Sequence, residues 1–85
     1  MRRIKMNFSK MTVKLANGHN FVFERQGKTT ALKVYDQQGK RVSAVVECIG
    51  EITAVIGKPL KFEYDSGISI DEYQTTSLVS TVETI

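Results

Sequence analysis

The first half of the chain alternates between apolar and polar residues with a period of two. Such alternation predicts strands that bury one face and expose the other. Asn17-Gly18 follows the opening segment and indicates a hairpin, because both residues tolerate a positive φ. The apolar positions of the opening segment are Ile4, Met6, Phe8, Met11, Val13 and Leu15.

Two more strands are predicted before residue 36. Residues 21–25 are aromatic and β-branched, and residues 31–35 carry Leu32 and Val34 on one side. Residues 26–28 and 36–40 contain the Gly, Gln and Asp that are typical of turns. The first 36 residues therefore predict an antiparallel meander of three or four strands.

The apolar period changes after residue 41. Apolar and β-branched residues now recur at helical spacing and cover an arc of about 120° at about 100° per residue. Ser43 is a suitable N-cap, and Gly57 is a suitable residue just after a helix end. We therefore predict one amphipathic helix over residues 44–56. The positions in the stripe are Val42, Val45, Val46, Ile49, Ile52, Thr53 and Ile56.

A second interpretation of this segment stays open. Gly50 inside a helix costs up to ~1 kcal/mol relative to alanine. The Thr, Ile and Val content of the segment also permits two strands that are broken at Gly50. The two capping residues favour the helix.

Strand patterns return after the predicted helix. Apolar residues alternate with charged residues over residues 60–64, and residues 65–67 form a turn. Ile68 and Ile70 extend one more short strand, and residues 71–73 are predicted to be a loop. Residues 75–85 are rich in Thr, Ser and Val, which is strand composition.

Together these elements predict an α+β fold. A small antiparallel β-sheet, the β-meander, packs against the helix of residues 44–56 in two layers. The alternative is a small all-β barrel, if residues 42–57 are strand. The length of 85 residues, with 41% hydrophobic and 25% charged residues, predicts a single domain over residues 1–85. The expected core joins Val45, Val46, Ile49, Ile52 and Ile56 to Phe21, Phe23, Leu32, Val34, Leu60 and Phe62.

The net charge of +3 hides an uneven distribution along the chain. Residues 1–41 contain ten Lys and Arg and two acids, which gives +8. Residues 42–85 contain two Lys and seven acids, which gives −5. This asymmetry favours a charged partner, unless basic and acidic strands lie side by side and neutralise each other.

The outward face of the predicted N-terminal sheet is the candidate binding surface. Cations there can bind phosphates and a ring can stack on a base, as on surfaces that hold single-stranded nucleic acid. One exposed aromatic is fewer than the two or three that are usual on such surfaces. A solvated face on which lysines prevent aggregation is the plain alternative. The candidate residues, for a protein partner or for nucleic acid, are Arg3, Lys5, Lys14, Lys33 and Tyr35.

The sequence shows no recognisable catalytic machinery. The single histidine, His19, lies beside a predicted turn, and the single cysteine, Cys48, lies on the flank of the helical stripe. The acids of residues 65–72 lack the spacing of a calcium loop, and Gly27-Lys28-Thr29 lacks the earlier glycine of a phosphate loop. We therefore predict that the protein is not an enzyme and needs no cofactor or metal.

The sequence also predicts where the protein is located and whether it self-associates. One cysteine cannot form an internal disulfide, which suits a reducing cytoplasm. No apolar run approaches ~18 residues, so we expect a cytoplasmic protein without a membrane partner. The uncharged segment of residues 75–80 can pair with another edge, so we expect a monomer or a weak homodimer.

The chain also resembles small accessory proteins of phages and prophages, a group that includes anti-CRISPR proteins and other anti-defence inhibitors. The features that carry the resemblance are the short chain, the meander with Asn17-Gly18, and Thr75-Thr76-Ser77 before Val79. The resemblance implies an inhibitor that binds a host macromolecule. We therefore expect a non-enzymatic protein that acts by protein–protein contact, with nucleic-acid binding through the basic N-terminal sheet as the alternative.

Overall fold

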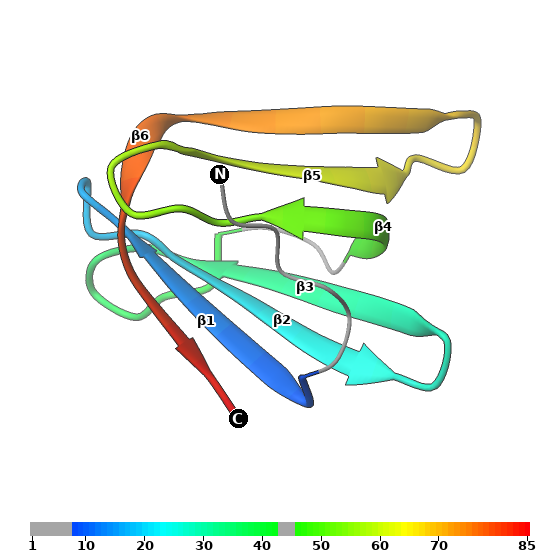
Figure 1. Cartoon of the computed structure of the whole chain (residues 1–85), viewed down its shortest axis with the longest axis horizontal. Helices are drawn as coiled ribbons and strands as arrows, with labels where there is room; N and C mark the ends of the chain where they lie inside the picture. The colour runs from blue at the N-terminus through cyan, green and yellow to red at the C-terminus, as the bar shows by residue number, and fades with distance from the viewer. Residues whose placement is uncertain (1–7, 43–45) are drawn as a thin grey trace.

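A computed structural model describes residues 8–42 and 46–85 of the chain. These residues form six antiparallel strands that follow one another around a closed barrel (Figure 1). The strands are β1 (Lys10–Leu15), β2 (Asn20–Gln26), β3 (Thr29–Tyr35), β4 (Val46–Thr53), β5 (Pro59–Asp65) and β6 (Ile70–Thr84).

Strand β6 closes the barrel because it is long enough to pair with two neighbours in succession. Its first part pairs with β5, from Ile70 opposite Asp65 to Leu78 opposite Pro59. Its second part pairs with β1, with Val79 opposite Leu15 and Thr84 opposite Met11. Figure 1 shows β6 bending between these two parts, so that β4, β5 and the first part of β6 lie across from β1, β2 and β3.

The predicted helix of residues 44–56, and with it the α+β fold, is wrong. Residues 46–53 form strand β4, so the all-β alternative describes the chain. Gly50 has a φ of +72°, whereas a right-handed helix needs about −63°. The N-cap candidate Ser43 lies outside the described residues.

A β-bulge at Gly50 interrupts the period of two that would have marked β4 as a strand. Ile49 pairs with Glu63 and Ile52 pairs with Phe62, so two extra residues stand between consecutive pairs. Cys48 and Ile52, four residues apart, are therefore both buried inside the barrel. The bulge thus removes Gly50 from the inward row of β4, and Ile52 is the inward residue after it that belongs to the predicted stripe.

Residues on the outer side of β4 completed the stripe. Ile49 and Thr53 alternate with the buried residues and are half-buried, whereas Ile56 is 68% exposed and not in the core. Gly57, with a φ of +86°, belongs to the turn between β4 and β5. In that turn the amide of Lys58 donates a hydrogen bond to the carbonyl of Val55 at 3.0 Å.

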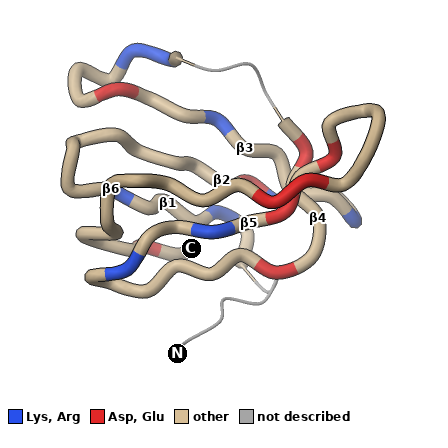
Figure 2. The backbone as a smooth tube through the Cα atoms, turned by 90° about the horizontal axis from the view of Figure 1, so that it is seen from above, with Lys and Arg blue, Asp and Glu red and all other residues tan. Residues whose placement is uncertain are grey.

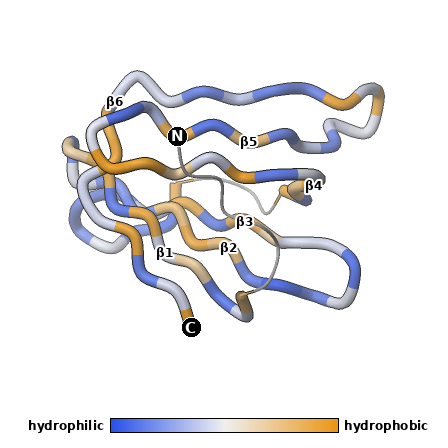
Figure 3. The backbone as a smooth tube through the Cα atoms, in the orientation of Figure 1, coloured by the Kyte–Doolittle hydropathy of each residue, from blue (hydrophilic) through white to orange (hydrophobic). Residues whose placement is uncertain are grey.

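The expected loop at residues 71–73 is also wrong, because these residues belong to β6. Figure 3 shows that the first part of β6 is largely hydrophilic. Alternation of apolar and polar residues therefore did not predict a strand there. The strands predicted from the first half and from residues 60–64 and 75–85 are present. Ile4 and Met6 lie outside the described residues.

The interior contains one tightly packed region, which we call the packed core. Its members are at most 1% exposed, do not line the pocket described below, and come from four of the strands and from both layers, so the packing joins the layers. Burial of such a side chain contributes roughly 1.5–3 kcal/mol relative to exposure. The packed core consists of Met11, Val13, Phe23, Cys48, Ile52 and Leu60.

Candidate functional site

The structure describes three of the five predicted surface residues. Lys14 lies on β1, and Lys33 and Tyr35 lie on β3. Asn20 of β2 pairs with both Lys14 and Tyr35, so these side chains share the outer face of the barrel. Arg3 and Lys5 lie outside the described residues.

Acidic residues are interspersed on this outer face. Glu24 lies on β2 within 3.8 Å of Lys33, measured from Oε1 to Nζ. Both side chains are more than a third exposed to solvent, so this ion pair contributes little to the stability of the fold. The pair lowers the local positive charge, and binding of nucleic acid or protein to this face stays a prediction.

The opposite layer is acidic on its outside. Glu47 pairs directly with Asp65 across β4 and β5, and Glu63 pairs with Glu72 across β5 and β6. Like charges directly opposite each other repel. Figure 2 shows several acidic segments gathered near β4 and β5, while the basic segments are scattered.

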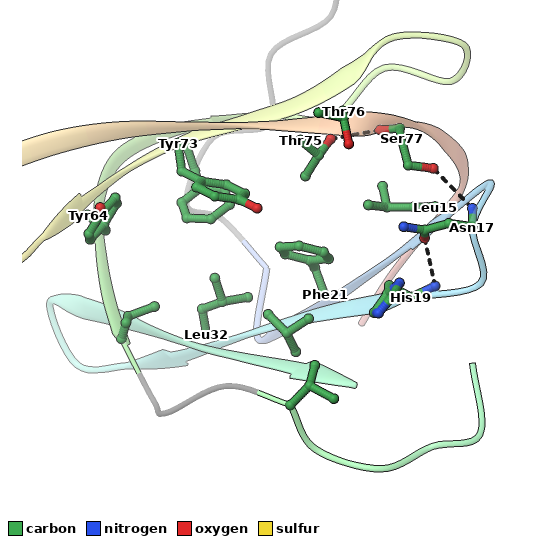
Figure 4. A pocket seen from close by; sticks show the side chains of 14 residues that line it. Leu15, Asn17, His19, Phe21, Leu32, Tyr64, Tyr73, Thr75, Thr76 and Ser77 are labelled. Carbon is green, nitrogen blue, oxygen red and sulfur yellow. Dashed lines mark hydrogen bonds between the residues drawn. The ribbon is translucent and has the colours of Figure 1, made fainter. Parts of the chain in front are cut away.

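A pocket of about 470 Å³ lies between the two layers, beside the packed core. Phe21 and Val34 line it from β2 and β3, and Tyr64 and Tyr73 line it from β5 and β6. Figure 4 shows Tyr73 and Phe21 facing each other across the space between the layers. The pocket exists because β6 pairs with β1 only after its bend, so no described strand bridges the layers on this side.

Aromatic rings form the wall of the pocket. The ring of Tyr73 lies 5.3 Å from that of Phe62 and 6.5 Å from that of Phe21, between centroids. The interplanar angle between Tyr73 and Phe21 is 30°, which is a stacked arrangement. Tyr73 is nevertheless 44% exposed, and Val42 at the same mouth is 52% exposed.

One end of the pocket is polar. The backbone amide of Asn17 donates to the hydroxyl of Ser77 at 3.0 Å, and the amide of His19 donates to Oδ1 of Asn17 at 3.0 Å. Figure 4 shows these three side chains together at this end. Nδ1 of His19 is buried and has no hydrogen-bond partner among the described residues. A buried nitrogen of this kind favours a polar group in the pocket that bonds to it.

The sequence patterns did not reveal this site. They predicted Phe21 and Phe62 in the core, Tyr73 in a loop and His19 beside a turn. Alternation correctly puts Phe62 and Tyr64 on one side of β5. No sequence pattern distinguishes a side chain that lines a hollow from one that fills a core, because both are apolar.

Cys48 belongs to the packed core and does not line the pocket. Burial raises the pKa of the Cys48 thiol from 9.0 to about 12, so the thiol is protonated near neutral pH and is a poor nucleophile. Over residues 8–42 and 46–85, no three His, Cys, Asp or Glu side chains are grouped as metal ligands. The arrangement therefore suits binding by shape and apolar contact.

No helix among the described residues is long and apolar enough to cross a membrane. Comparisons of the chain with protein-family models, with curated proteins and with solved structures found no match.

Proposed function

We propose that the protein is a non-enzymatic binding module that holds a protein partner by enclosing apolar side chains of the partner in the pocket. The pocket itself is the observation that carries the proposal. Its volume of about 470 Å³ lies in the range of ~300–1,000 Å³ that is typical of binding pockets. Its lining is mostly apolar, with a few polar groups at one end.

The mouth of the pocket supports a macromolecular partner. Tyr73 and Val42 leave about half of their surface in contact with solvent beside the opening. Exposed apolar groups around a hollow are typical of interaction sites, and tyrosine is enriched among the residues that dominate binding energy. Inhibition of a host macromolecule, as the resemblance to phage accessory proteins implies, is one use of such contact and stays a prediction.

Selection from a displayed library of random peptides of roughly ten residues tests the proposal. Selected peptides are titrated against the protein and its variants by calorimetry. We expect Tyr73→Ala to weaken binding by about tenfold or more, which corresponds to about 1.4 kcal/mol. Leu78→Ala is the matched control, because Leu78 lies on the same strand, is 45% exposed and does not line the pocket.

Two outcomes would contradict the proposal. One is equal loss of affinity in the Tyr73 and Leu78 variants. The other is binding of a single-stranded oligonucleotide that weakens steeply with salt, with a slope of about −0.7 per neutralised phosphate, while no peptide binds. That second result would favour the nucleic-acid alternative on the face of Lys14, Lys33 and Tyr35.

A further inference from the structure

The first part of β6 has an open edge. Among the described strands, residues 70–76 pair with none but β5: residues 70–74 have partners in register there, and residues 75 and 76 lie at a shift of that register. Strand β1 pairs with residues 79–84, and the β1–β2 turn reaches back no further than Ser77, through the amide of Asn17. Residues 70–76 therefore present on their other side a row of backbone groups that can pair with a further strand.

This edge runs along the mouth of the pocket. Tyr73, Thr75 and Thr76 line the pocket from the edge segment, and Val34 and Val42 line it from across the mouth. Figure 4 shows the β6 segment on one side of the space and β3 on the other. A strand added to this edge lies about 4.8 Å from β6 and covers the opening. Alternate side chains of such a strand point into the pocket.

The negative charge around this edge favours an added strand that is basic. Glu72 of the edge segment lies opposite Glu63 of β5, and Asp71 lies opposite Tyr64, next to Asp65. Nζ of Lys61 lies 3.8 Å from Oε1 of Glu72, so this cation pairs with one of the acids. The group remains acidic, so it attracts a basic segment and steers its approach.

The same charges disfavour a second copy of this chain as the occupant. Antiparallel pairing of two identical edges places two acidic segments, each with Asp71 and Glu72, side by side, and their like charges repel. Charged residues on an edge strand are a common means of preventing pairing between identical edges. The partner is therefore a different chain.

We propose that the partner supplies an extended, basic segment that adds as a strand to residues 70–76 of β6 and inserts alternate apolar side chains into the pocket. This inference rests on the proposed function and specifies the form and charge of the bound segment. Backbone pairing provides affinity in this mode of recognition, and the pocket provides selectivity for alternate side chains.

Backbone methylation of a peptide selected from the random library tests the strand addition. Two series are made, one with N-methyl groups on its odd amides and one on its even amides. Because only alternate amides of a strand face a given neighbour, we expect one series to lose binding by about a hundredfold and the other to lose about threefold or less. Amide hydrogen exchange of residues 70–76 should slow by about tenfold or more in the complex.

Charge variants test the second half of the inference. We expect Asp71→Asn with Glu72→Gln to weaken binding by about tenfold in low salt and less in high salt. Glu83→Gln, on the part of β6 that pairs with β1, is the matched control and should change binding by less than about twofold. The selected peptides should be enriched in Lys and Arg and depleted of proline.

The outcomes separate this inference from the proposed function. Equal effects of the two methylated series, together with dependence on Tyr73, would overturn strand addition and leave pocket binding intact. Selection of acidic or proline-rich peptides would overturn the expected partner chemistry. A dimer without peptide, in which residues 70–76 are protected from exchange, would assign the edge to a second copy.

Discussion

Phe21 and Phe23 lie two residues apart on the same face of β2, yet their surroundings differ. Phe23 is fully buried in the packed core, and its ring packs edge-on against Phe62 at 5.6 Å between centroids. Phe21 lines the pocket and stacks near the half-exposed ring of Tyr73. Strand β5 repeats this division, with Leu60 in the packed core and Tyr64 at the pocket.

The difference lies in how the barrel closes and not in the kind of side chain. Beside Val13 and Met11, the second part of β6 pairs with β1 and the strands enclose the interior. Beside Phe21 and Tyr73, the first part of β6 pairs with β5 alone among the described strands. Apolar side chains near the open edge therefore line a hollow that a partner can fill.

The largest effect is expected from removing a ring in the packed core. Phe23→Ala should lower the free energy of unfolding by ~3–5 kcal/mol, because it leaves a cavity that the surrounding strands cannot fill. Denaturant unfolding monitored by circular dichroism measures this loss. Val22→Ala is the control, because Val22 is the half-buried neighbour on the outer face, and it should lose about 1 kcal/mol or less. Similar losses in both variants would contradict the assignment of inner and outer faces.

A smaller effect is expected from the thiol in the packed core. The pKa of Cys48 is about 12 in the folded protein against 9.0 for the free group, so the folded state keeps a proton that the unfolded state releases above pH 9. The contribution of the protonated Cys48 thiol to the free energy of unfolding is complete below about pH 9 and is lost as the pH rises towards 12. By pH 11 the chain should lose about 2–3 kcal/mol more than a Cys48→Ala variant, at about 1.4 kcal/mol per pKa unit. Urea unfolding of both proteins from pH 8 to 11 measures the difference, and parallel pH profiles would show that the thiol is accessible to solvent.

The smallest effect on stability is expected at the pocket. Tyr73→Ala should lower the free energy of unfolding by about 1 kcal/mol or less, because its ring is 44% exposed and its removal widens an open space. The same variant is expected to lose binding about tenfold, as proposed above. A loss of stability as large as that of Phe23→Ala would mean that the pocket is part of the packed core and not a binding site.

Local pattern alone predicted much of the strand layout. Alternation of apolar and polar residues identified β1, β2, β3 and β5, because a strand that buries one face needs that period. Asn17-Gly18 marks the first hairpin for a local reason too, and Gly18 has a φ of +91°. The uneven charge along the chain is also visible in the sequence. It accounts for the acidic outer surface of β4, β5 and β6, because seven of the nine acids follow residue 41.

Tertiary structure decided the rest. Residues 46–53 carry apolar spacing that suits a helix as well as a bulged strand, and pairing of β4 with β3 and β5 selected the strand. The hydrophilic residues 71–73 became strand because β5 offered them backbone partners, which no side-chain pattern records. The pocket and the open edge arise where β6 bends from one neighbour to the other. Sequence pattern reports which residues prefer burial, but only the assembled strands determine whether the space between them is filled.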